Sequence, residues 1–283
     1  MTCDMPLTAG EAWRRAGQRI GRQEARLLLE HVCGCTHATL IAHPEQVLSK
    51  EQTIRFEGLV QRRLGGEPFA YLVGSAWFMG LEFVVDPAVL VPRPETELLV
   101  DLAARHATAG GWAQARLVDL GTGSGIVAVM IARRCPHAEL TAVDLSAGAL
   151  AVAKANAARH GAAIRFLQGD WFAPLKDERF DLIVANPPYV AEGDPHLDLN
   201  GLPFEPRQAL TDGIAGGDGL ECIRRIVTGA GRHLVPRGAL LMEHGYDQAV
   251  EVRRLLQEAG FCEVASWRDD AGIERVSGGR LPG

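Results

Sequence analysis

The sequence has 283 residues, of which 47% are hydrophobic and 23% are charged, and no apolar run approaches the roughly 20 residues that span a membrane. The formal net charge at pH 7 is −6, and it is unevenly divided: residues 1–75 hold nine basic and eight acidic residues, the remainder 20 and 27. Because duplex-binding domains usually carry a basic footprint, this balance disfavours nucleic acid as a partner.

Residues 8–64 are predicted to be helical, because apolar residues recur there mostly at steps of three and four. Ser49 precedes Gln52 by three positions, the spacing of a capping box, and Gly34 is suited to a helix C-terminus. No clear strand pattern interrupts the region. We therefore expect residues 1–75 to form a small helical bundle. Such a module usually binds a partner or supports its neighbour, and we assign it to substrate recognition.

The cysteines predict neither a metal site nor a disulfide framework. Cys33 and Cys35 are followed by His37, but no second Cys or His pair with ligand spacing follows them. The first residues do not have the pattern of a secretory signal. We expect a cytoplasmic protein without a metal ion.

Residues 76–92 are predicted to form a β-hairpin that links two domains. Apolar residues between Trp77 and Val84 alternate loosely around Gly80. The stretch Pro92-Arg93-Pro94-Glu95-Thr96-Glu97 follows, and its prolines favour an extended loop before a helix that begins at Glu95 or Thr96.

From residue 93 the sequence predicts alternating strands and helices. The expected strands are 117–120, 140–143, 164–167 and 180–185, and the clearest helices are 126–134 and 147–159. After them we expect a long loop, a helix, a strand at 239–242, a helix at 248–259 and two final strands. Such alternation indicates βαβ units with right-handed crossovers. The predicted fold class of residues 93–283 is α/β, a doubly wound and mostly parallel sheet.

A glycine-rich turn, Gly121-Thr122-Gly123-Ser124-Gly125, joins the first strand to the first helix. Ile126 replaces the last glycine of a dinucleotide fingerprint, and the lysine of a phosphate-binding loop is missing. Asp144 ends the next strand, 23 residues after Gly121, where a carboxylate can accept both ribose hydroxyls of a nucleoside. The alternative role for Asp144 is to cap the following helix. A nucleoside site without a pyrophosphate cradle favours S-adenosylmethionine.

Asp170 and Trp171 follow the third strand and should reach the same edge of the sheet. An acidic residue there can accept a hydrogen bond from the adenine amino group, and an aromatic ring can lie on the base. Trp171 as an ordinary core residue remains the alternative.

The fourth strand ends in Asn186-Pro187-Pro188-Tyr189. Neither proline can continue the ladder, so Asn186 is held at the carboxyl end of the buried run 182–185. A methyl group on sulfonium needs a nucleophile placed in line, and the Asn186 oxygen with the Pro187 carbonyl can orient a planar NH₂ group. Tyr189 can stack on that group. We assign catalysis to Asn186, Pro187 and Tyr189, and substrate binding to all four residues; an ordinary strand-closing turn is the alternative.

Several segments together resemble the peptide chain release factor glutamine N5-methyltransferases, which are class I methyltransferases with a Rossmann-like fold. The resemblance covers nearly the whole chain and is carried by Gly66-Glu67-Pro68, Ala70-Tyr71-Leu72, Pro92 to Glu97, Val118 to Gly125, Asn186 to Tyr189, Phe204-Glu205-Pro206, Glu243-His244-Gly245 and Glu274-Arg275-Val276. It implies a helical domain, a hairpin and a methyltransferase domain. It also implies S-adenosylmethionine as donor, S-adenosylhomocysteine as product, and the glutamine of the Gly-Gly-Gln loop of class 1 release factors as acceptor.

The resemblance places the cofactor residues at Gly121 to Gly125, Asp144, Trp171 and Asn186, and the amide contacts at Asn186 to Tyr189. It gives no role to Glu205, Glu243 or His244. The alternatives are a nucleic-acid adenine N6-methyltransferase, which shares Asn-Pro-Pro-Tyr, a binding module without catalysis, and a dehydrogenase. We expect a monomer that binds neither membrane nor nucleic acid directly.

Overall fold

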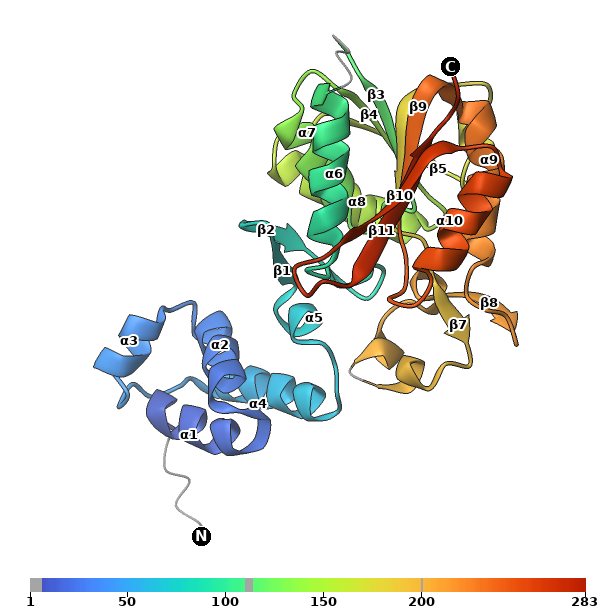
Figure 1. Ribbon diagram of the computed structural model, residues 1–283. Helices are drawn as coiled ribbons and strands as arrows, with labels where there is room; N and C mark the ends of the chain where they lie inside the picture. Colours follow the sequence, from blue (N-terminus) through green and yellow to red (C-terminus); the bar gives the residue numbers. More distant parts are fainter. Residues whose placement is uncertain (1–6, 110–113, 200) are drawn as a thin grey trace. The chain divides into compact units, whose positions relative to one another are not determined.

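The computed structural model describes residues 7–109, 114–199 and 201–283 (Figure 1). The chain divides into two compact units, Met1–Gly74 and Ser75–Gly283, called here the helical unit and the α/β unit. Within the described ranges, every helix is too short or too polar to cross a membrane.

The helical unit contains α1 Ala9–Ile20, α2 Arg22–Cys33, α3 His37–Ala42, α4 Lys50–Leu64 and α5 Phe69–Val73. The predicted capping box at the start of α4 is present: the Gln52 backbone N–H donates to Ser49 Oγ over 3.0 Å, and the Ser49 N–H donates to Gln52 Oε1 over 2.9 Å. Gly34 ends α2 with a φ of 62°. Leu28, Leu29 and Val60 are fully buried in the core of this unit.

The α/β unit begins with the hairpin of β1 Ser75–Phe78 and β2 Leu81–Val84. The strands and helices that follow are α6 Thr96–Ala109, β3 Arg116–Leu120, α7 Ile126–Arg134, β4 Glu139–Asp144, α8 Ala147–Arg159, β5 Ile164–Gln168, β6 Phe180–Ala185, β7 Val190–Glu192, β8 Thr211–Ala215, α9 Glu221–His233, β9 Leu234–Glu243, α10 Ala249–Glu258, β10 Cys262–Arg268 and β11 Glu274–Arg280. The prediction of alternating strands and helices is confirmed.

Seven strands form the central sheet in the order β10-β11-β9-β6-β3-β4-β5. The five strands from β9 to β5 run parallel, and β11 and β10 pair antiparallel at one edge. Helices α6 and α7 lie on one side of the sheet, and α9 and α10 on the other (Figure 1). The sheet is thus doubly wound and mostly parallel, as predicted.

Both faces of the sheet are buried, which explains the continuous apolar run of β6. Leu182 and Val184 pack with α6 and α7, whereas Ile183 and Ala185 face the core formed with α9 and α10. All four side chains are 0% exposed. The prediction of a buried parallel strand ahead of Asn186 is therefore confirmed.

The segment between β6 and α9, expected to be a long loop, contains further structure. β7 and β8 pair parallel, and three short 3₁₀ turns, Pro195–Asp198, Leu202–Phe204 and Arg207–Ala209, lie between them. These pieces have three to five residues each, too short to produce a periodic pattern. β9 also starts at Leu234, before the predicted 239, because the strand includes an irregularity around Arg237, whose φ is 65°.

Asn156 on α8 ties the hairpin to the glycine-rich turn. It is 0% exposed. Its Oδ1 accepts from the Val84 N–H at 2.7 Å, and its Nδ2 donates to the carbonyls of Val84 at 2.9 Å and Ser124 at 2.8 Å. The side chain thus satisfies three backbone groups of two segments that are far apart in sequence.

We expect Asn156→Ala to lower the melting temperature, because it leaves buried backbone groups without partners at roughly 1–3 kcal/mol each. The loss should be at least about 2 kcal/mol, measured by thermal unfolding followed by circular dichroism. Lys154→Ala, an exposed change on the same helix, is the control and should stay within about 0.5 kcal/mol of wild type. Equal stability of the two variants would contradict this role of Asn156.

Candidate active site

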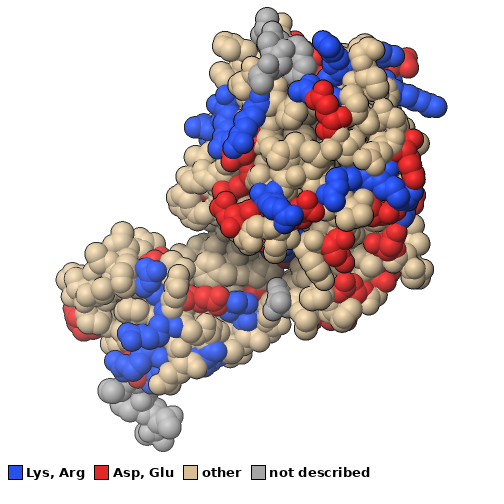
Figure 2. Space-filling view, in the orientation of Figure 1, with Lys and Arg blue, Asp and Glu red and all other residues tan. Residues whose placement is uncertain are grey.

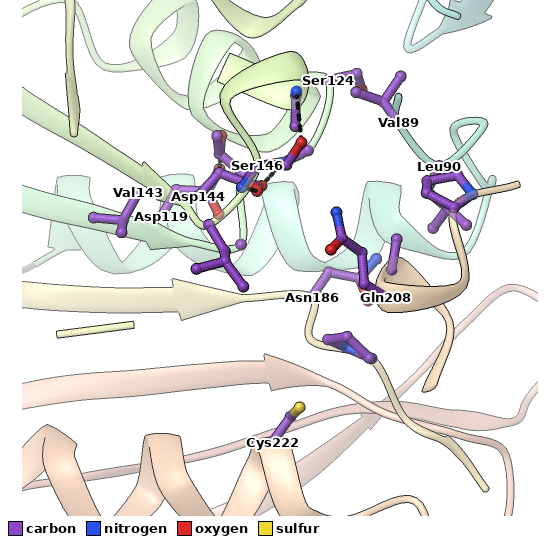
Figure 3. Close-up of a pocket in the computed structure, with 18 of the residues that line it drawn as sticks. Val89, Leu90, Asp119, Ser124, Val143, Asp144, Ser146, Asn186, Gln208 and Cys222 are labelled. Atoms are coloured by element: carbon purple, nitrogen blue, oxygen red, sulfur yellow. Dashed lines mark hydrogen bonds between the residues drawn. The ribbon is translucent and has the colours of Figure 1, made fainter. Parts of the chain in front are cut away.

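A cavity of about 270 Å³ opens in the α/β unit at the carboxyl ends of β3, β4 and β6 (Figure 3). Leu120 of β3 pairs with Val143 on one side and with Ala185 on the other. Gly121, Asp144 and Asn186 therefore follow at the same level of three neighbouring strands. This is the edge where open α/β sheets bind ligands.

The glycine-rich turn forms one wall of the cavity. Gly121, Thr122, Gly123 and Ser124 line it, whereas Gly125 packs behind the turn, where an added Cβ would lie 3.0 Å from Ala153 Cβ. Gly121 has a φ of 73°, and a Cβ there would lie 3.3 Å from the Trp171 ring. Glycine at Gly121 thus lets the turn adopt its left-handed conformation with its backbone beside the cavity.

Asp144 lines the same wall and accepts two backbone hydrogen bonds. The Gly123 N–H donates to its Oδ2, and the Ser146 N–H donates to its Oδ1, each over 2.8 Å. Burial raises the pKa of the Asp144 carboxyl, and these hydrogen bonds oppose the increase. The N-cap of α8 is Ser146, so the carboxylate holds the turn before that helix and the glycine turn, and the alternative of a helix cap does not apply to Asp144. Since each oxygen has a second lone pair, it can still accept from a ligand.

Asp170 and Trp171 both line the cavity, beyond the end of β5. The Asp170 carboxylate is ion-paired with Arg225 of α9, another lining residue. Trp171 has a φ of 47°, unusual for an aromatic residue, and its ring lies against Gly121 while also packing on the core. Trp171 thus packs partly on the core, and its contact with adenine stays a prediction.

Asp119 is a lining residue that the sequence analysis did not select. It is 1% exposed, and the Thr122 hydroxyl donates to its Oδ2 over 2.6 Å. Burial, with a smaller contribution from the Asp144 charge, raises the pKa of Asp119 to about 7. Its negative charge is thus complete only above that pH. The sequence did contain a signal for this residue, because Asp119 is an acidic residue within the otherwise apolar run of β3.

Asn186 lies in the cavity wall opposite Asp119 and Asp144 (Figure 3). Its Nδ2 donates to Thr96 Oγ1 over 3.2 Å, and Thr96, at the start of α6, is 1% exposed. This contact occupies the amide nitrogen on the protein side. The contact uses one of the two N–H groups and fixes the amide, so that its oxygen is the acceptor that the side chain can offer to a ligand.

The other residues of the turn occupy different surroundings. Pro188 lines the cavity, but Pro187 is buried behind it, and Tyr189 is not a lining residue. The Tyr189 hydroxyl donates to Glu243 Oε1 over 3.4 Å, and burial raises the pKa of that hydroxyl. The backbone carbonyl of Tyr189 accepts from Gln248 Nε2 over 2.9 Å. Stacking of Tyr189 on the acceptor amide stays a prediction.

Glu205 joins the two segments that form the mouth of the cavity. It is 6% exposed; its Oε2 accepts from the Val91 N–H at 3.0 Å, and its Oε1 accepts from Arg93 Nη2 at 2.5 Å. Val91, Arg93 and Pro206 line the cavity. His244, in contrast, is bonded among the edge strands, where its Nε2 lies 2.7 Å from Ser277 Oγ.

Comparison with known proteins shows similarity along almost the whole chain. The family profile described as PrmC N-terminal domain matches residues 9–74, and the one described as Methyltransferase small domain matches residues 95–201. A Bordetella pertussis protein named release factor glutamine methyltransferase is 52% identical, over 92% of this chain and 95% of its own length. A protein of the same name from Burkholderia pseudomallei is 48% identical, over 98% of both chains.

Among solved structures, a T. Thermophilus 16S rRNA methyltransferase in complex with AdoMet and guanosine superposes with a TM-score of 0.54 at 20% identity. The match covers 73% of this chain and 49% of that one. A Pyrococcus furiosus methyltransferase gives a TM-score of 0.53 at 16% identity, covering 78% and 97%. At these identities the likeness establishes the fold.

We expect Glu205→Ala to destabilise the protein, because it leaves the Val91 N–H and the Arg93 guanidinium without their buried partner. Removing one member of a buried ion pair costs about 3–5 kcal/mol, and the partial exposure of Arg93 should bring the loss nearer 2–3 kcal/mol. The measurement is the melting temperature. Glu258→Ala removes an exposed ion pair with Arg254 and should change stability by less than about 1 kcal/mol. A loss of stability no larger than that of the Glu258→Ala control would refute the proposal that Glu205 holds the two segments together.

Proposed function

The chain belongs to the release factor glutamine methyltransferases, and we propose that it methylates the side-chain amide nitrogen, N5, of the glutamine in the Gly-Gly-Gln loop of class 1 release factors. S-adenosylmethionine is the methyl donor. The observation that carries the proposal is the 52% identity to a relative of that name over 92% of the chain. The site supports it, because Asn186 stands at a strand end beside a nucleoside-sized cavity.

The charges of the cavity wall fit this donor, which carries a sulfonium. The charged lining residues are Asp119, Asp144, Asp170, Asp212, Arg93 and Arg225. Both arginines are already ion-paired, Arg93 with Glu205 and Arg225 with Asp170. Carboxylates therefore dominate the field inside the cavity, and such a field favours a cationic ligand.

We infer the following division of roles for the nucleoside. Gly121 and Gly123 let a ligand approach the backbone of the glycine-rich turn, and Asp144 is placed to accept from ribose hydroxyls. Asp170 and Trp171 flank the position expected for adenine. When bound, S-adenosylmethionine supplies a methyl group that is already activated for transfer.

In this division of roles, Asn186 binds and orients the acceptor amide. An amide nitrogen is a poor nucleophile, because its lone pair is delocalised into the carbonyl. With its nitrogen held by Thr96, Asn186 can accept one hydrogen of the acceptor NH₂ on its oxygen, and the Pro187 carbonyl is the second candidate acceptor. Two such contacts orient the lone pair and stabilise positive charge as the new bond forms.

We propose that the helical unit recognises the release factor, since the catalytic residues all lie in the α/β unit. The protein would act as a monomer in the cytoplasm, where release factors function in translation. A nucleic-acid substrate is less well supported, because the similar proteins are named release factor glutamine methyltransferases. In addition, basic and acidic side chains are interspersed on the face of the α/β unit shown in Figure 2, so this face has no continuous basic patch.

We expect Asp144→Ala to bind S-adenosylmethionine more weakly while the protein remains folded. Losing a charge-assisted hydrogen bond should cost about 1.5–3 kcal/mol, and loosening of the glycine turn adds to this. Isothermal titration calorimetry measures the affinity. Asp177→Ala, a change outside the described cavity wall, is the control. An Asp144 variant with wild-type affinity would exclude the ribose role.

The function itself is tested by mass spectrometry of a class 1 release factor incubated with the protein and S-adenosylmethionine. We expect the mass of one methyl group on the loop glutamine. Asn186→Ala should reduce the single-turnover rate on the order of 10²–10³-fold, because it removes a preorganised acceptor. Asn186→Asp, which keeps an oxygen acceptor, should retain more activity. No methyl transfer by wild type would refute the function, and a near wild-type rate for Asn186→Ala would refute the mechanism.

A further inference from the structure

A row of buried polar side chains continues behind Asn186, on the side away from the cavity. Asn186 donates to Thr96 Oγ1 over 3.2 Å, and the Thr96 hydroxyl lies near enough to the Glu243 carboxyl, at the end of β9, to lower the pKa of that carboxyl through hydrogen bonding. Tyr189 donates to the same carboxyl over 3.4 Å. Thr96 and Glu243 are each 1% exposed. The row therefore joins the start of α6, the end of β9 and the turn after β6, and its two central members, Thr96 and Glu243, are buried.

A contribution to the stability of the fold does not explain why a glutamate occupies position 243. Its Oε2 is buried without a hydrogen-bond partner in the part of the chain that the structure describes. A carboxyl group in this state costs free energy, and an apolar side chain of the same shape would avoid that cost. The charged groups that face it are Glu95 beside Thr96 and Arg275 on β11, and His244 follows it in the chain, just after the end of β9.

The proton of the Thr96 hydroxyl determines which way the Asn186 amide faces. A hydroxyl has a single proton to donate, and an ionised carboxylate only accepts. When Glu243 is ionised, the Thr96 proton must point to Glu243, so Thr96 can only accept from Asn186. The amide nitrogen of Asn186 is then held at Thr96, and its oxygen faces the cavity.

On this geometry, and resting on the function proposed above, we propose that Glu243 is a positioning residue that sets the orientation of the Asn186 amide through Thr96. In its ionised form it presents the Asn186 oxygen to the acceptor amide. In its protonated form it can donate to Thr96, which frees the Thr96 proton for the Asn186 oxygen. The amide can then turn over and present its NH₂ group, which cannot accept from the acceptor amide.

This arrangement makes methyl transfer sensitive to pH. Burial and the nearby Glu95 raise the pKa of Glu243 to about 7, while Thr96, Arg275 and Tyr189 act in the opposite direction. Because the folded pKa is raised and the ionised form is the active one, the transfer rate should fall as the pH drops through about 7. Well below that value the decrease should approach tenfold per pH unit, as for one titrating group.

The experiment measures single-turnover methylation of a class 1 release factor between pH 5.5 and 8.5. S-adenosylmethionine is kept saturating, so that the titration of Asp119 in the donor cavity does not contribute. Wild type should show the fall below about pH 7. Glu243→Gln, which cannot ionise, should react about 100-fold more slowly at pH 8 through misplacement of Asn186, without the acid fall and with an unchanged KM for the release factor.

Thr96 provides a second pair of variants, which keeps the proposal testable should Glu243→Gln not fold. Thr96→Val removes the hydroxyl that links Glu243 to Asn186, so this variant should transfer methyl groups slowly at every pH. Thr96→Ser keeps the hydroxyl and should show the wild-type transfer rate and its fall at acid pH. Among the residues that the structure describes, Glu192 also has a buried oxygen without a hydrogen-bond partner, while its other oxygen is ion-paired with Arg207. Glu192→Gln is therefore the control and should retain the acid fall.

An acid fall that persists in Glu243→Gln or Thr96→Val, or a wild-type rate in either variant, would overturn the role of Glu243 and leave the proposed function intact. Wild type that transfers no methyl group at any pH would instead refute the function, and this proposal with it.

Discussion

The parallel register of β4, β3 and β6 is the constraint on which the site depends. Because Leu120 pairs with both Val143 and Ala185, the residues that follow on the three strands reach the same edge at the same level. Parallel strands place all their carboxyl ends together, and the crossover helices leave that edge open. A glycine turn, a carboxylate and an amide thereby meet, although they are widely separated in the sequence.

Buried carboxyl groups hold the surrounding segments in place. Asp119 fixes Thr122 in the glycine turn, Glu205 joins the loop before α6 to the segment after β7, and Glu243 lies behind Asn186. Each is at most 6% exposed. Burying a carboxyl group is unfavourable unless its partners are well placed, and removing one such group alone leaves those partners unsatisfied.

Methyl transfer to an amide makes unusual demands on a protein, because the nucleophile has little basicity and the donor needs no acid to assist departure. The useful contribution is orientation by acceptors that are already in position. In the mechanism proposed here, the Asn-Pro-Pro-Tyr turn would meet this demand on the cavity side, where its prolines restrict the backbone. On the buried side it depends on Thr96, which belongs to another element altogether.

Short-range residue patterns in the sequence were sufficient to predict the architecture and part of the candidate site. The run Leu182 to Ala185, the glycines from Gly121 to Gly125 and the strand-ending Asp144 were identified from sequence, because burial on two faces, left-handed turns and strand ends each impose a local residue preference. Thr96, Glu205 and Glu243 acquired roles only in the folded chain. Their partners lie 90, 112 and 54 residues away, and such contacts arise from strand order and register, which no short window of sequence encodes.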